Sequence, residues 1–246
     1  MNKVYVLALC LFTAFFTSCQ FSENIYINED GSGKMEFKFD ASGLMQMAGD
    51  EMAKDGEEAM DSTIVFKELF EEMKDSISNL SKEEQEKLKA LEDFSMHMVM
   101  NPETKEMKFN MFTNFKNVDE LQDMFAAMNK MQSLDKKSKN DDSPFGSLDS
   151  KTTELSYKYD GKRFKRSAKI VDKELHQQAM DSLGEMAMMF ASSKYKLNYY
   201  FPKKIKSVSK EGVMFSEDRK SFTVEYGFIE YLQNPESLNI EVVLED

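Results

Sequence analysis

The sequence predicts an α+β protein: an antiparallel sheet built from hairpins, with amphipathic helices packed on one face. Three observations lead to this prediction. Segments that alternate apolar and polar residues occur in pairs around short turns. Three of these pairs are each followed by a segment whose apolar residues recur at helical spacing. The short reversals favour antiparallel pairing, and an antiparallel sheet with one apolar face needs a covering layer.

The first hairpin is predicted around Asp30-Gly31-Ser32-Gly33, because alternating residues flank it on both sides. An Asp-Gly pair in that position is a strong hairpin signal. Beyond residue 42 the apolar spacing becomes helical, most clearly over residues 65–80. Ser81 and Glu84 have the spacing of a capping box, which predicts the start of a further helix.

The next two units follow the same order. A hairpin is predicted over residues 94–111 with its turn at 101–104, and an amphipathic helix begins at Asn117. The third hairpin turns at Asp160-Gly161, and Asp172 caps the helix after it. The three units share neither a fixed period nor side-chain identity, so we interpret the repetition as architectural.

The C-terminal part is predicted as strands and turns. Residues 195–201, 222–226 and 238–244 alternate in the manner of strands, and one helical turn is expected over 228–232. The predicted organisation of the chain is a signal peptide (1–18), a lipidated tether (19–24), a hairpin-helix region (25–132), a flexible loop (133–150), and a hairpin-helix and strand region (151–246) assigned to the same domain as 25–132.

Residues 1–18 have the pattern of a secretory signal peptide. Lys3 is their only charged residue, an apolar run occupies residues 4–16, and the small polar pair Thr17-Ser18 precedes Cys19. The run is shorter than the roughly 20 apolar residues of a membrane-spanning helix. We therefore expect export and cleavage before Cys19, with a buried N-terminal helix as the alternative.

The four residues Phe16-Thr17-Ser18-Cys19 resemble the lipobox of bacterial lipoproteins, in the looser form known from Bacteroidetes. This resemblance covers only the N-terminal tract. It implies a diacylglyceryl group on the Cys19 sulfur, acylation of the new amino terminus, and attachment to a membrane through that residue. Gln20 is not the aspartate that retains some lipoproteins at the inner membrane, so the resemblance implies the outer membrane. Few acids follow in residues 20–24, which favours the periplasmic face over surface exposure.

A second resemblance is to the LppM-type lipoprotein domains of mycobacteria, which have no known function. It combines the Asp30-Gly31-Ser32-Gly33 turn after a lipobox cysteine with Tyr199-Tyr200-Phe201-Pro202 and the closing strands. This likeness is one of pattern, and it implies no site residues.

Composition excludes several classes of function. Cleavage before Cys19 leaves 246 − 18 = 228 residues with a side-chain charge of 31 − 44 = −13. A body this acidic is repelled by nucleic acid, and it contains only three arginines, so no nucleic-acid partner is expected. The two cysteines are Cys10 in the apolar run and Cys19, so the mature chain has no thiol for catalysis, zinc or redox chemistry.

The chain contains 20 methionines and 20 phenylalanines but no tryptophan. Methionine is an adaptable side chain that fills irregular cores and also forms binding surfaces for apolar ligands. We favour core packing for most of these residues. The candidate apolar ligand face is Met124, Met128, Met186 and Met189.

No catalytic or metal-binding motif is recognisable, and no cofactor is expected. His97 and His176 are the only histidines, and neither has a partner at metal-ligand spacing. The sequence therefore favours a non-catalytic envelope lipoprotein that binds a lipid, a peptide or a partner protein. An envelope hydrolase with a dispersed active site and a purely structural lipoprotein are the alternatives. A histidine near both a serine and a carboxylate in a pocket would favour the hydrolase.

Overall fold

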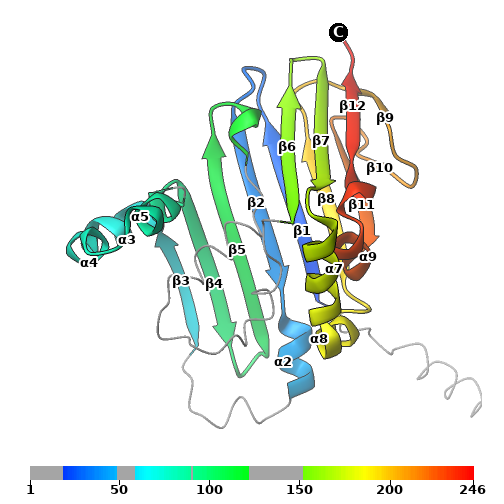
Figure 1. Ribbon diagram of the computed structural model, residues 1–246. Helices are drawn as coiled ribbons and strands as arrows, with labels where there is room; N and C mark the ends of the chain where they lie inside the picture. The colour runs from blue at the N-terminus through cyan, green and yellow to red at the C-terminus, as the bar shows by residue number, and fades with distance from the viewer. Residues whose placement is uncertain (1–18, 49–58, 90, 122–151) are drawn as a thin grey trace, which may run out of the picture.

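The computed structural model describes residues 19–48, 59–89, 91–121 and 152–246. These residues form an α+β fold with two sheets, whose strand orders are β10-β11-β8-β1-β2-β5-β4-β3 and β6-β7-β12-β9. All described strand pairs are antiparallel except β1 with β8, which are parallel. Figure 1 shows the smaller sheet in front of the part of the larger one that contains β1, β8 and β11.

The larger sheet contains β1 (Gln20–Ile27), β2 (Gly33–Asp40), β3 (Met60–Val65), β4 (Phe94–Asn101), β5 (Glu106–Phe115), β8 (Lys194–Tyr200), β10 (Met214–Phe215) and β11 (Ser221–Gly227). The smaller sheet contains β6 (Thr153–Tyr159), β7 (Arg163–Ile170), β9 (Ile205–Val208) and β12 (Ile240–Leu244). The α-helices are α2 (Ser42–Ala48), α3 (Phe66–Glu72), α4 (Lys74–Ser78), α5 (Lys82–Lys89), α7 (Lys173–Ser182), α8 (Gly184–Met189) and α9 (Phe228–Gln233). Two 3-10 helices, η2 (Val118–Glu120) and η3 (Pro235–Leu238), complete the described elements.

The three predicted hairpins are present, and turn chemistry explains two of them. Gly31 and Gly161 have φ values of 83° and 87°, a backbone conformation that glycine adopts without steric cost. The Asp30 carboxylate accepts a hydrogen bond from the Ser32 N–H at 3.0 Å, and Asp160 accepts one from the Lys162 N–H at 2.9 Å. In both turns an aspartate side chain accepts a backbone hydrogen bond, and the glycine after it provides the positive φ that the turn requires.

Two predicted helix caps are also confirmed. The Ser81 N–H donates to the Glu84 carboxylate at 2.8 Å, and the Glu84 N–H donates back to the Ser81 hydroxyl at 3.3 Å. The Asp172 side chain accepts from the Leu175 N–H at 2.9 Å, at the start of α7. The helix predicted from Asn117 begins as η2, and residues 122–131 and the predicted loop at 133–150 lie outside the described residues.

The predicted tether at residues 19–24 is wrong from Gln20 onward, because β1 begins there. Phe21 is fully buried, and its ring stacks on Phe228 and Phe39 with centroid distances of 3.9 and 4.5 Å. The alternation of β1 is hidden in the sequence because Glu23 stands at an inward position. Residues that resemble a polar linker therefore form a central strand.

The covering layer also differs from the prediction. A second sheet, rather than helices alone, lies over β1, β8 and β11 (Figure 1). Helices α3, α4 and α5 instead project from the β3–β4 side of the larger sheet as a separate lobe (Figure 1). The predicted helical stripe over 65–80 starts at Val65, which is the last residue of β3, a strand that the sequence did not indicate; α3 follows it directly.

One buried polar cluster joins the two sheets. Glu23 of β1 is opposite Leu197 of the parallel strand β8, so Tyr195 and Tyr199 lie on the same face at either side of it. The hydroxyls of Tyr195 and Tyr199 both donate to the Glu23 carboxylate. From the smaller sheet, the Tyr157 hydroxyl donates to the same carboxylate at 3.0 Å, and the Arg166 Nε lies 3.4 Å from it.

The arginine of this cluster is completely buried. Its Nη1 donates to the Leu238 carbonyl at 3.2 Å, whereas Nε and Nη2 have no hydrogen-bond partner among the described residues. Burial is the largest single effect and acts to lower the pKa of Arg166, but the Glu23 carboxylate and the surrounding tyrosines together hold that pKa above its usual value. The guanidinium is therefore charged, and Glu23 is its counter-ion in the interior.

We expect Glu23→Gln to lower the free energy of unfolding by about 3–5 kcal/mol, because it leaves the Arg166 charge buried without a counter-ion. Urea denaturation of the soluble domain measures the change. The matched control is Glu225→Gln on the outer face of the same sheet, where Glu225 pairs with Lys194 and Lys196 at 3.6 and 3.4 Å in partial exposure. That variant should lose less than about 1 kcal/mol. The double variant Glu23→Gln/Arg166→Met should recover most of the loss, and equal losses for Glu23→Gln and Glu225→Gln contradict the assignment.

The cluster also predicts a loss of stability in alkaline solution. Burial, and then the Glu23 charge, raise the pKa of Tyr195 and Tyr199 well above the value of about 10 for an unfolded tyrosine. Above pH 10 the unfolded chain releases these protons while the folded chain retains them, so this contribution is complete below pH 10 and declines as pH rises. Phenolate absorbance and circular dichroism, followed together, should show part of the tyrosine titration only when the fold is lost. Complete titration of the tyrosines before any change in circular dichroism contradicts this prediction.

Candidate functional site

The helical lobe of α3, α4 and α5 contains the candidate binding groove. Val65 ends β3 and directly precedes α3, so the lobe is attached to the sheet without a linker. Phe66, at the first position of α3, is 2% exposed, and its ring stacks on Phe70 with a centroid distance of 5.9 Å. Met73 both ends α3 and precedes α4, and the capping box of Ser81 and Glu84 opens α5. These short helices are therefore fixed by their ends and by one buried aromatic pair.

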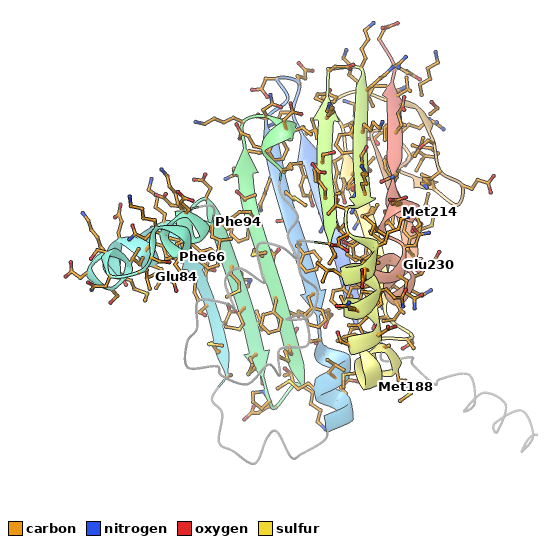
Figure 2. All side chains as sticks on the ribbon, in the orientation of Figure 1. Phe66, Glu84, Phe94, Met188, Met214 and Glu230 are labelled. Atoms are coloured by element: carbon orange, nitrogen blue, oxygen red, sulfur yellow. The ribbon has the colours of Figure 1, made fainter. Side chains whose placement is uncertain are left out.

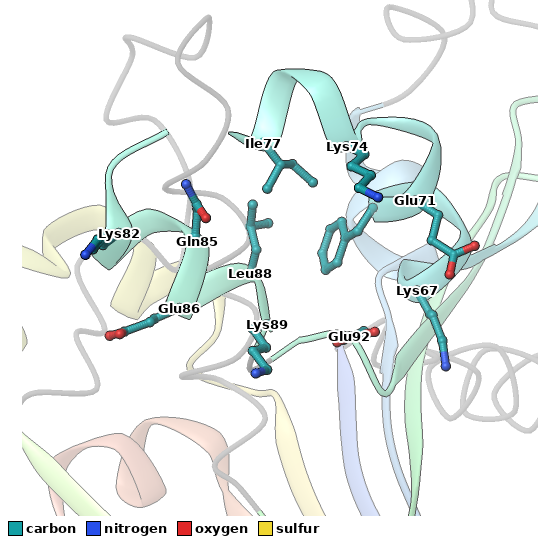
Figure 3. Close-up of a pocket in the computed structure, with 11 residues that line it drawn as sticks. Lys67, Glu71, Lys74, Ile77, Lys82, Gln85, Glu86, Leu88, Lys89 and Glu92 are labelled. Atoms are coloured by element: carbon teal, nitrogen blue, oxygen red, sulfur yellow. The ribbon is translucent and has the colours of Figure 1, made fainter. Parts of the chain in front are cut away.

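The groove between the three helices has an apolar floor. Phe70 of α3, Ile77 of α4 and Leu88 of α5 line it, and Figure 3 shows Ile77 and Leu88 pointing toward one another. Its volume is about 460 Å³, within the range of small-molecule sites. A floor with one residue from each helix is suited to an apolar chain that lies between them.

Charged side chains form the rim of this groove. Lys67, Lys74, Lys82 and Lys89 line it together with Glu71, Glu86 and Glu92 (Figure 3). None of the four lysines forms an ion pair with any side chain in the described part of the chain. A lysine without a counter-ion is available to a negatively charged headgroup, so the groove combines an apolar floor with cationic positions at its edge.

A second apolar feature lies on the larger sheet, and we call it the methionine face. Strand register places its members on one side of β3, β4 and β5: Met60, Ile64, Met96, Met98, Met100, Met107 and Phe109. Apart from Met60, which is 36% exposed, these side chains are half-buried. The strands therefore concentrate the methionines in this region, whereas the sequence pointed to helical ones.

Most of the predicted apolar ligand face lies outside the described residues. Met124 and Met128 lie outside them, and so does the side chain of Met186. Met189 is 52% exposed near the end of α8, and its neighbour Met188 is 76% exposed. The structure thus describes only one of the four side chains, which lies on the surface, and the face of four methionines stays a prediction.

Cys19 lies at the start of β1, in a buried position. It is 2% exposed in the full chain, and its carbonyl accepts a hydrogen bond from the Lys194 N–H at 3.3 Å. The Ser193 hydroxyl and the backbone of Leu44 lie beside its sulfur, and burial raises the pKa of the Cys19 thiol to about 11. A glyceryl group on this sulfur requires its immediate neighbours to move aside. Acylation of Cys19 remains a prediction from the sequence.

The two histidines lie on different elements and have different partners. His97 is partly exposed on β4, and its Nε2 lies 2.8 Å from the carboxylate of Asp61 on β3. His176 is 8% exposed on α7, and its Nε2 lies 3.2 Å from the Gln233 carbonyl. Among the described contacts, neither ring reaches both a serine and a carboxylate, which was the arrangement that favours a hydrolase.

The described residues include no group of three or more histidine, cysteine, aspartate or glutamate side chains that could hold a metal ion. Their helices are all too short or too polar to cross a bilayer.

Comparison with known proteins adds one distant likeness. No protein-family model matches the chain, and no curated protein matches it. The folded domain of LppM from Mycobacterium tuberculosis, determined by NMR, aligns over 95% of this chain and 94% of that domain with 9% sequence identity and a TM-score of 0.35. At that TM-score the alignment carries no argument about function, and the lipobox resemblance remains a prediction from residues 16–19 alone.

Sequence reasoning missed the groove because its floor is non-local. The spacing of Phe70 and Ile77 indicated an amphipathic stretch, but it did not show that Leu88 of a later helix faces them. No role was assigned to the lysines of the rim from the sequence. The available signal was an apolar stripe bordered by lysines and glutamates.

Proposed function

We propose that this protein is an exported, lipid-anchored lipoprotein of the bacterial outer membrane, and that it acts as a non-catalytic binding module. The lipobox resemblance at Cys19 supports the anchor. The groove of the helical lobe supports the binding role, and it is the observation on which that role depends. Its ligand class is a small amphiphile with an apolar chain and one anionic headgroup.

The chemistry of the groove leads to this ligand class. An apolar chain on Phe70, Ile77 and Leu88 removes hydrocarbon from water, at about 25 cal/mol for each Å² buried. A carboxylate or phosphate at the rim meets lysines that have no ion-pair partner among the described side chains. The glutamates of the rim disfavour a second negative charge, so a singly charged headgroup suits the site.

The anchor is tested on protein expressed with its own signal in a bacterium that processes lipoproteins. We expect the intact mass of the membrane-bound protein to correspond to residues 19–246 plus the acyl groups. Cys19→Ser should abolish both acylation and cleavage at this site, so the variant should keep residues 1–18 and show the mass of the unprocessed chain. A Cys19→Ser protein that matures normally and stays with the envelope contradicts the anchor.

Groove binding is tested with dodecanoate as the probe, by calorimetry on the soluble domain. We expect Ile77→Glu to weaken binding at least about tenfold, because it places a carboxylate on the apolar floor and repels the headgroup. The matched control is Met73→Glu, which adds the same charge to the same lobe at a position that is 46% exposed and does not line the groove. Lys74→Gln should weaken binding about two- to fivefold and reduce its dependence on salt. Equal affinities for the Ile77→Glu and Met73→Glu variants contradict the groove as the site.

A further inference from the structure

The absence of a tether determines how an acylated protein must sit on its membrane. β1 begins at Gln20, and the Cys19 carbonyl is already bonded to the first residue of β8. One residue of extended chain spans only about 3.5 Å, so no linker separates the lipid from the folded body. Whatever surrounds Cys19 on the protein surface therefore lies at the headgroups.

The surface near Cys19 contains the most exposed apolar side chain of the described residues. Ser193, beside the Cys19 sulfur, follows α8 closely, and α8 carries Met188 and Met189 with exposures of 76% and 52%. Figure 2 shows Met188 at the end of the molecule where α2 and α8 lie, opposite the C-terminus. These two exposed methionine side chains are not part of the core. Apolar side chains of this kind are compatible with the boundary between headgroups and acyl chains.

This end of the molecule is not basic. Lys194 pairs with Glu225 at 3.6 Å, and the Asp40 carboxylate lies close enough to Cys19 to raise the pKa of that thiol, as a smaller effect than burial. Attraction to anionic lipid therefore does not explain a contact here. A contact formed by methionine side chains depends on apolar burial and is insensitive to salt.

We infer that the tip of α8, formed by Met188 and Met189, is a second membrane contact that seats this end of the protein in the bilayer interface beside acylated Cys19. The inference rests on the proposed acylation. The acyl groups already provide attachment, so the α8 tip fixes the orientation of the body and not its retention. In this orientation β1 and β8 rise from the membrane, and the C-terminus points away from it (Figure 1).

A depth measurement on the full chain tests this contact. Met188→Cys introduces a single thiol into the acylated protein, and an environment-sensitive fluorophore on it reports the bilayer in phosphatidylcholine vesicles. Met214→Cys is the matched control, because Met214 is also exposed, at 62%, but lies on β10 away from Cys19 (Figure 2). We expect brominated lipid to quench the label at 188 at least about twofold more than the label at 214, because an interfacial apolar face lies several Å into the headgroup boundary. Raised salt and added anionic lipid should not change this difference.

The intact mass of the labelled protein shows whether Cys19 is acylated, so the α8 contact and the anchor are tested separately. Equal, weak quenching at 188 and 214 in protein whose mass shows acylated Cys19 overturns the α8 contact and leaves the proposed anchor intact. Protein without acyl groups that does not bind vesicles overturns both. Strong quenching at 188 in protein without acyl groups means that the α8 tip holds the protein on the membrane by itself, which overturns both the proposed anchor and the orienting role inferred for the tip. The double variant Met188→Ser/Met189→Ser should keep its acylation and vesicle binding while a label at Gln46→Cys, an exposed position of α2, loses its quenching.

Discussion

The buried carboxylate of Glu23 is the constraint on which the arrangement of the two sheets depends. A charge in the interior needs a counter-ion and hydrogen-bond donors, and no single element of this fold supplies them all. β8 provides two tyrosine hydroxyls, whereas β6 and β7 provide a third hydroxyl and the guanidinium of Arg166. Because Tyr157 and Arg166 are directly opposite each other in the β6–β7 hairpin, they approach Glu23 as a pair. The smaller sheet can therefore satisfy the cluster in only one register over the larger one.

The same interaction explains which end of the larger sheet is covered. The second sheet lies over β1, β8 and β11, where the tyrosines and Glu23 are, and the fully buried residues concentrate there. Farther along the sheet, toward β3, the inner side chains are half-buried methionines, and the helical lobe projects beyond them. The fold is thus a rigid half with a charged centre beside a half with adaptable apolar side chains. Binding functions are commonly found in parts of a protein that are less tightly packed than its core.

The sequence predicted the features that local chemistry determines. Asp-Gly turns, the Ser81–Glu84 capping box and the Asp172 cap each depend on residues within four positions of one another, and the structure contains all of them. The sequence did not predict β3, β9 or the start of β1. The start of β1 was missed because Glu23 interrupts an otherwise apolar inner face, and a charged residue is ordinarily evidence for exposure. The pairing of β7 with β12 joins residues such as Arg166 and Ile240, and nothing local in either segment specifies the other. For the same reason the floor of the groove, which Leu88 completes, could not be inferred from spacing.

The net charge of the body affects how the protein would be oriented on a membrane. The chain without residues 1–18 carries −13 in side-chain charge, so an anionic leaflet repels the body as a whole. That repulsion decays over about 8 Å at physiological salt, whereas an eight-residue strand such as β1 spans about 26 Å. In the proposed acylated protein, β1 rises from the membrane at Cys19 and carries its far end beyond three screening lengths, so only residues near the proposed anchor lie close to the charged surface. In that zone Lys194 neutralises Glu225, and the exposed tip of α8 is methionine. An acidic body and an apolar tip thus favour the same upright orientation, and this orientation keeps the groove in solution, where a soluble amphiphile can reach it.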